Sequence, residues 1–135
     1  MTKFSLVDRK AFDFGIGIML HPAEIHMVTT VDMLGEAGVT ELAEEFGTTK
    51  GAVSQLVGRL VAKDLLIKEV DSGNRSRVII RTTELGQKAS NNHLDFHKGH
   101  DREFMQYLGG LDDEAYETVN KLGKEMNFWM DRYLK

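Results

Sequence analysis

Cysteine is absent from this sequence of 135 residues. Its absence excludes disulfide bonds, catalysis by a thiolate, thiol-based redox sensing and metal sites built on sulfur ligands. A metal ion bound by this chain must therefore use imidazole nitrogens and carboxylate oxygens, and the chain has five histidines for the first of these roles.

The sequence also lacks a long apolar run. No stretch approaches the roughly 18 apolar residues that a membrane span requires, and the N-terminal residues do not follow the pattern of a signal peptide. Hydrophobic residues make up 41% and charged residues 28% of the chain, which is typical of a globular domain in water. We expect a single domain in the cytoplasm that does not associate with a membrane.

Proline is scarce too, since Pro22 is the only one, and helical patterns dominate the chain. Residues 3–20 space apolar side chains three and four positions apart, which predicts an amphipathic helix: Phe4, Val7, Ala11, Phe14 and Ile18. Pro22 suits the first position of a second helix over roughly residues 22–35, which "GEAG" (35–38) ends.

The segment "VTELAEEFGTTKGAVSQLVGRLVAKDLL" (39–66) predicts two short helices joined by a tight turn. Thr40 is the expected cap of the first helix, and Gly47 supplies the turn after it. Thr48 or Thr49 is the expected cap of the second, whose inward face is Val53, Leu56, Val57 and Leu60. Two helices in this arrangement form a helix-turn-helix.

The pattern then changes to a β ribbon and returns to helix. "LIKEV" (66–70) and "VIIRT" (78–82) are short β-prone runs, separated by the turn-rich and basic residues 71–77. Residues 84–108 and 112–134 have helical spacing, with Asp112 as the expected cap of the last helix.

Charge is distributed unevenly along the chain. The net charge is −4, yet residues 47–82 carry seven basic side chains and only three acidic ones: Lys50, Arg59, Lys63, Lys68, Arg75, Arg77 and Arg81 against Asp64, Glu69 and Asp71. An acidic protein with one basic segment is suited to local contact with a polyanion.

The order of these elements, with "ELAEEFGTTKGAVSQLVGRL" and a ribbon running into "TTELG", resembles the MarR family of winged helix-turn-helix regulators. The resemblance implies a mainly α fold with a small β-wing, in one MarR-like domain over residues 1–135. Within it, residues 22–83 would form the DNA-binding lobe, and residues 1–21 and 84–135 the dimerisation helices. The implied function is a homodimeric transcription regulator, such as a repressor, that binds pseudo-palindromic double-stranded DNA and is not an enzyme.

The residues of the second short helix fit this function. The N-terminal part of a recognition helix enters the major groove, so small and polar side chains belong there. Gln55 can read a base edge with two hydrogen bonds, Arg59 is placed for a phosphate, and Arg75 at the ribbon tip suits a narrow minor groove. The predicted DNA-binding residues are Thr48, Thr49, Lys50, Ser54, Gln55, Arg59, Arg75 and Arg77.

Three histidines cluster in "HLDFHKGH" (93–100), a stretch of the helix expected from residue 84. On a helical wheel His93, His97 and His100 interrupt the apolar stripe, so they are expected to face inward. Three interpretations remain open: hydrogen-bonded structural histidines, a pH-sensitive group, or a metal site, for which two histidines four residues apart have suitable geometry.

A second resemblance bears on the metal interpretation. The zinc-sensing branch of the MarR family is similar in taking a carboxylate from the first helix, a histidine from the second and a histidine pair from the fifth. Carried over to this chain, the implied ligands are Asp8, His26, His93 and His97. Asp8 stands where that branch has a longer Glu.

The effector expected from this resemblance is a divalent metal, zinc first. The alternative for the same DNA-binding regulator is a small organic ligand in the cleft between the dimer helices and the DNA-binding lobe. A metal-binding protein or an enzyme, in either case without DNA binding, is less favoured, and for the enzyme no pair of nucleophile and base and no glycine-rich phosphate loop is visible.

Overall fold

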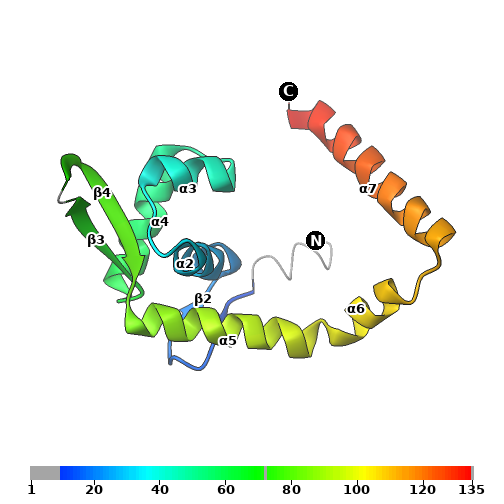
Figure 1. Ribbon diagram of the computed structural model, residues 1–135, viewed down its shortest axis with the longest axis horizontal. Helices are drawn as coiled ribbons and strands as arrows, with labels where there is room; N and C mark the ends of the chain where they lie inside the picture. Colours follow the sequence, from blue (N-terminus) through cyan, green and yellow to red (C-terminus); the bar gives the residue numbers. More distant parts are fainter. Residues whose placement is uncertain (1–9, 72, 135) are drawn as a thin grey trace. The chain divides into compact units, whose positions relative to one another are not determined.

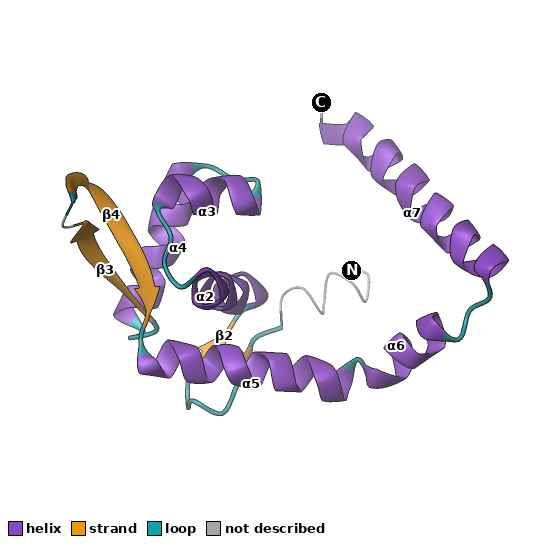
Figure 2. Ribbon diagram, viewed as in Figure 1, coloured by secondary structure: helices purple, strands orange, loops and turns teal. Residues whose placement is uncertain are grey.

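The computed structural model describes residues 10–71 and 73–134, without the side chains of residues 74–76. The chain is mainly helical with a small β ribbon, as predicted (Figures 1 and 2). Its elements are β1 (Phe12–Asp13), β2 (Met19–Leu20), α2 (Pro22–Leu34), α3 (Val39–Phe46), α4 (Lys50–Ala62), β3 (Leu66–Asp71), β4 (Asn74–Thr82), α5 (Glu84–His100), α6 (Arg102–Gly109) and α7 (Asp113–Leu134). They fall into two compact units, divided between Phe96 and His97.

Residues 12–20 form an antiparallel β-hairpin, so the helix predicted over residues 3–20 is wrong there. Asp13 stabilises the turn, because its Oδ1 accepts hydrogen bonds from the backbone N–H groups of Ile16 and Gly17, both at 3.0 Å. Gly15 and Gly17 both have φ of +77°, a left-handed conformation that interrupts a helix and that glycine adopts without strain. Residues 3–9 of the predicted helix lie outside the described residues.

The helix-turn-helix forms as the sequence predicts, with one different cap. Gly47 ends α3 in the left-handed conformation (φ 60°, ψ 38°), and the Thr49 hydroxyl caps α4 by accepting the N–H of Ala52 at 3.1 Å. The expected cap Thr40 is wrong, because α3 already begins at Val39 with Gly38 as its N-cap.

The wing is anchored to the helices through a short backbone bridge. Strands β3 and β4 pair antiparallel, from Leu66 opposite Thr82 to Val70 opposite Val78. Between α2 and α3, Ala37 donates to the Ile80 carbonyl at 3.0 Å, and Ile80 donates back to the Ala37 carbonyl at 2.8 Å. The β ribbon therefore gains a third backbone partner at its base.

One hydrophobic core joins the elements of the first unit. Its fully buried side chains come from β2, α2, α3, α4, β3 and β4: Leu20, Val28, Val31, Leu42, Val57, Leu60, Leu66 and Ile80. Apolar burial of this kind contributes about 25 cal/mol per Å². This core holds α4 in place so that its other face lies in solvent.

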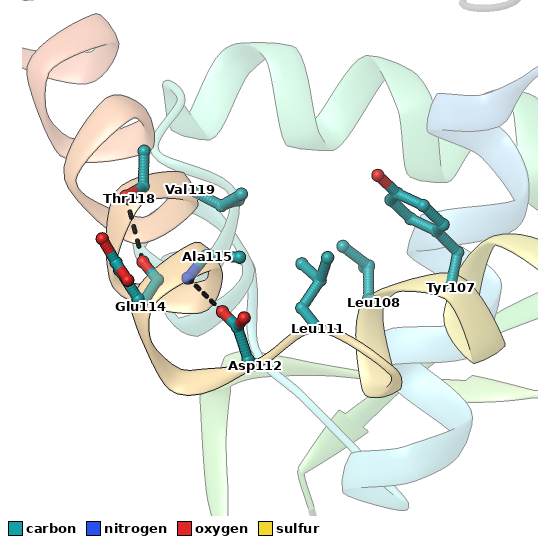
Figure 3. A pocket seen from close by; sticks show the side chains of 8 residues that line it. All are labelled: Tyr107, Leu108, Leu111, Asp112, Glu114, Ala115, Thr118 and Val119. Carbon is teal, nitrogen blue, oxygen red and sulfur yellow. Dashed lines mark hydrogen bonds between the residues drawn. The ribbon is translucent and has the colours of Figure 1, made fainter.

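The helix predicted over residues 84–108 is interrupted, which corrects the prediction. Asp101 leaves the helical conformation (φ −94°, ψ 1°) between α5 and α6. Gly99 lies two residues before it, and a glycine in a helix lowers the stability of the helix by about 1 kcal/mol relative to alanine. The predicted cap of the last helix is confirmed, since Asp112 Oδ1 accepts the N–H of Ala115 at 2.8 Å (Figure 3). In the described single chain, neither α6 nor α7 has a buried residue.

The first turn of α5 packs directly against the chain segment before β3. A Cβ added to Gly86 would lie 2.1 Å from the Leu65 carbonyl oxygen, so we expect Gly86→Ala to lower the free energy of unfolding by about 1–3 kcal/mol. Gly99→Ala is the control on the same helix, because a Cβ there meets no described atom within 4 Å. Urea unfolding checks both variants, and equal stability of the two would contradict this packing.

Candidate nucleic-acid interface and histidine cluster

Helix α4 has one buried face and one exposed polar face. Val53, Val57 and Leu60 are buried at spacings of four and three, which places them on one side of the helix. The residues predicted to contact DNA from this helix and the turn before it lie at the surface: Thr48, Thr49, Lys50, Ser54, Gln55 and Arg59. Five of these residues gather at the turn and the N-terminal half of α4, where a hollow of about 380 Å³ lies beside the turn, whereas Arg59 lies in the last turn of the helix.

The C-terminal end of α4 is tied to the start of α2. Lys63, the C-cap of α4, forms an ion pair of 2.6 Å with Glu24, whose side chain is only 5% exposed. The other oxygen of Glu24 accepts the backbone N–H of His21 at 3.1 Å, which caps α2. One buried carboxylate therefore fixes both helix ends.

The environment of Glu24 favours its charged form. Burial raises the pKa of the Glu24 carboxyl, but the hydrogen bond and charge of Lys63 and the backbone hydrogen bond at His21 together lower this pKa below its usual value. The capping role of Glu24 was missed in the sequence, although its position three residues after the N-cap residue His21 is a capping signal.

The basic residues of the wing are paired with acidic residues. Arg77 Nη2 lies 2.7 Å from Glu41 Oε1 on α3, and its Nη1 lies 3.7 Å from Asp71 Oδ2. Arg81 binds Glu36 at 2.6 Å and Glu69 at 2.9 Å, and these carboxylates raise its pKa above the usual value.

These ion pairs alter the charge pattern that the sequence suggests. Three of the seven basic residues in 47–82 face carboxylates that come from outside this segment, namely Glu24, Glu36 and Glu41. Lys50 and Arg59 on α4 lie at the surface instead. Arg75 lies in β4, and its side chain is outside the described part of the wing.

His93 is the buried member of the histidine cluster, as predicted. Its Nδ1 shares a hydrogen bond of 3.0 Å with the Thr29 hydroxyl on α2. The ring of Phe14 packs edge-on against it at 5.3 Å between centroids, and the ring of His26 lies at 5.8 Å. Thr29 and Phe14 have no signal in the sequence that links them to His93, because they are distant along the chain.

The β-hairpin is fastened to the same place by the residue before His93. Asn92 Nδ2 donates to the Phe14 carbonyl at 2.5 Å, close against Gly15. Phe14 also packs against Phe96 at 5.8 Å between centroids. The hairpin, α2 and α5 therefore meet in an aromatic cluster around His93.

The other predicted metal ligands are not gathered into one set by the described structure. Asp8 lies outside the described residues. His97 belongs to the second unit, where its Nδ1 shares a hydrogen bond of 2.7 Å with Asp101 Oδ2. The side chain of His97 is 47% exposed, and His100 is exposed as well. The expectation that these two histidines face inward is therefore wrong for the single chain. Within residues 10–71 and 73–134, no three His, Asp or Glu side chains form a group that could hold a metal ion.

The corner between α6 and α7 contains a hollow of about 470 Å³ (Figure 3). Its lining is mostly apolar: Tyr107, Leu108, Leu111, Asp112, Glu114, Ala115, Thr118 and Val119. In the part of the chain that the structure describes, no helix is both long and apolar enough to cross a membrane.

Comparison with known proteins relates this chain to transcription regulators. The MarR family model matches residues 20–76, which include α2, the helix-turn-helix and the wing up to its tip. An uncharacterized HTH-type transcriptional regulator of Bacillus subtilis (strain 168), YhjH, is 25% identical over 114 residues, or 84% of this chain. This chain spans 65% of the length of that relative.

Two solved structures share the fold. The adhesin competence repressor AdcR from Streptococcus pyogenes has a TM-score of 0.72 and 19% identity, over 82% of this chain and 80% of its own. FabT from Streptococcus pneumoniae, solved in complex with DNA, has a TM-score of 0.67 and 18% identity, over 86% of this chain and 78% of its own. The chain thus has the winged helix-turn-helix fold that MarR-type transcription regulators share.

The ion pair at the end of α4 generates a prediction about stability. Glu24→Ala removes both the cap of α2 and the partner of Lys63, and we expect it to lower the free energy of unfolding by about 1–3 kcal/mol. Glu45→Ala, at an exposed position on α3, is the control and should change stability little. Urea unfolding measures both, and a stable Glu24→Ala variant would show that the pair does not hold the helix ends.

Proposed function

We propose that this chain is a DNA-binding transcription regulator of the MarR family that acts as a homodimer on pseudo-palindromic double-stranded DNA, in the manner of a repressor. The observation that carries the proposal is the exposed polar face of α4, held in place by buried Val53, Val57 and Leu60. The family match over residues 20–76 and the fold shared with FabT, solved in complex with DNA, support it.

In this proposal α4 enters the major groove and the wing follows the neighbouring backbone. Gln55 would read a base edge, because its amide can donate and accept at the same time. Thr48, Thr49, Lys50, Ser54 and Arg59 would bind phosphates or bases from the same exposed face, and Arg75 and Arg77 would contact DNA from the wing.

The proposed dimer rests on the second unit. In the described single chain, helices α6 and α7 have no buried residue, although α7 carries a long apolar stripe. The exposed apolar side chains of this unit include Phe104, Tyr107, Leu122, Met126, Phe128, Trp129, Met130 and Tyr133. So many exposed apolar groups require a covering surface, and a second copy of the chain would supply one. In this division, residues 22–83 form the DNA-binding lobe, and residues 1–21 and 84–135 form the dimerisation part.

Zinc is the proposed effector because two imidazoles from different helices lie side by side. The ring centroids of His26 on α2 and His93 on α5 are 5.8 Å apart, close enough for both to bind one ion. Since Thr29 occupies Nδ1 of His93, Nε2 of that ring would be the ligand. Asp8 and His97 would complete the proposed set, and a bound ion would link α2 to α5.

Such a link gives the effector its influence on DNA. Zinc bound to α2 and α5 would restrict the movement of both helices, and the coupling between zinc affinity and DNA affinity would be reciprocal. The alternative effector is a small organic ligand bound in the cleft between the dimer helices and the DNA-binding lobe.

The binding of DNA can be tested with a duplex selected by the purified protein from a random pool. We expect affinity to fall steeply as salt rises, because bound phosphates release counterions. Gln55→Ala should relax the preference at one base position, whereas Arg59→Ala should weaken binding to every duplex by a similar factor.

Fluorescence anisotropy on the selected duplex and on single-base variants distinguishes these effects. Glu45→Gln is the control, since Glu45 is exposed on α3 and is not among the proposed DNA-binding residues. Failure to select any duplex would refute the proposed function. Identical behaviour of the Gln55 and Arg59 variants would refute their separate roles.

The proposed zinc site predicts that histidine variants lose the ion. His93→Ala/His97→Ala and His26→Ala should bind zinc at least about tenfold more weakly than the parent, because each removes an imidazole ligand. His100→Ala is the control on α5. Competition with a chromophoric chelator measures zinc affinity directly, and parent-like affinity in the double variant would exclude this ligand set.

A further inference from the structure

Arg77 occupies a position between the wing and the helix-turn-helix. Its guanidinium lies 2.7 Å from the Glu41 carboxylate on α3, and its side chain is 44% exposed. The Asp71 carboxylate on β3 is further away, at 3.7 Å. Arg77 thus has one close partner, and much of its surface is accessible to solvent.

Arg81, the matching arginine four residues along β4, is held differently. Carboxylates bind it from two sides, Glu36 at 2.6 Å and Glu69 at 2.9 Å. It also lies at the base of the wing, opposite Ile67 and beside the pair of Leu66 and Thr82. Arg81 is therefore a structural brace, whereas Arg77 is fixed mainly by one exposed carboxylate.

We propose that Glu41 competes with DNA phosphate for Arg77, so that the Glu41–Arg77 ion pair limits the affinity of the wing for DNA. This inference rests on the proposed function and adds a residue that sets its strength. In the free protein Arg77 binds Glu41, and on DNA its guanidinium turns to a phosphate oxygen.

The energies involved permit this exchange. An exposed ion pair contributes only about 0–1 kcal/mol, so a single phosphate contact can replace it. The planar guanidinium binds a phosphate with the same paired N–H groups that bind a carboxylate. Removing the carboxylate should therefore tighten DNA binding by up to about fivefold, which is the equivalent of 1 kcal/mol.

The position of Glu41 keeps its carboxylate close to Arg77. It lies in the first turn of α3. The Gly38 position at the start of α3 lies against the same guanidinium, since a Cβ there would be 3.8 Å from Arg77 Nε. The start of α3 and the middle of β4 are thus held together around Arg77.

A double-mutant cycle on the selected duplex tests the competition. We expect Glu41→Gln to bind this duplex about two- to fivefold more tightly than the parent, and Arg77→Ala to bind it more weakly. In the Arg77→Ala background, Glu41→Gln should have no further effect, because the competition needs the arginine. Glu45→Gln on the same helix removes the same charge at an exposed position and controls for general electrostatics.

Each outcome of this cycle has a clear meaning. Weaker binding by Glu41→Gln would show that the ion pair braces the wing for DNA, which overturns the inference. An equal gain in the Arg77→Ala background, or from Glu45→Gln, would show a simple charge effect and would overturn it as well. Absence of duplex binding by the parent would refute the proposed function itself, and urea unfolding confirms that each variant is folded.

Discussion

Two backbone hydrogen bonds between Ala37 and Ile80 determine the arrangement of the winged helix. Both residues are fully buried, and the bonds join the connection between α2 and α3 to the C-terminal part of β4, at the base of the wing. Glu36 and Glu41, which lie close to Ala37 on either side, carry the carboxylates that meet the wing arginines. The bridge thus sets where the wing lies relative to α3 and which of its arginines meet carboxylates.

The helix-turn-helix could be predicted because its determinants are local. Gly47 provides the left-handed turn and Thr49 caps α4, and each acts on residues at most a few positions away. The N-terminal hairpin could not be predicted, because Asn92 fastens Phe14 from 78 positions further along the chain. The same apolar spacing serves an amphipathic helix and an aromatic cluster, and only the tertiary contact decides between them.

In the candidate sites, too, the features that depend on nearby residues could be predicted, and those that depend on residues distant in the sequence could not. The exposed face of α4 follows from the apolar period of its buried face, and the burial of His93 follows from its place on α5. The ion pairs do not follow from a charge count along the chain, because several of their acidic members lie outside the basic segment. His97 was expected to face inward, but it lies on the part of α5 that belongs to the second unit. A periodic pattern indicates which face of a helix is apolar, but it does not indicate what covers that face.

The contact of Gly86 with the Leu65 carbonyl makes the start of α5 a pivot. The carbonyl also accepts the N–H of Thr83 at 3.1 Å, so two positions at the start of α5 lie against the same group. His93 lies seven residues further on, about 10 Å along a helix axis, so a displacement of about 1 Å there corresponds to a tilt of about 6°. A small tilt of α5 about this point would therefore be enough to move His93 and the aromatic rings packed around it.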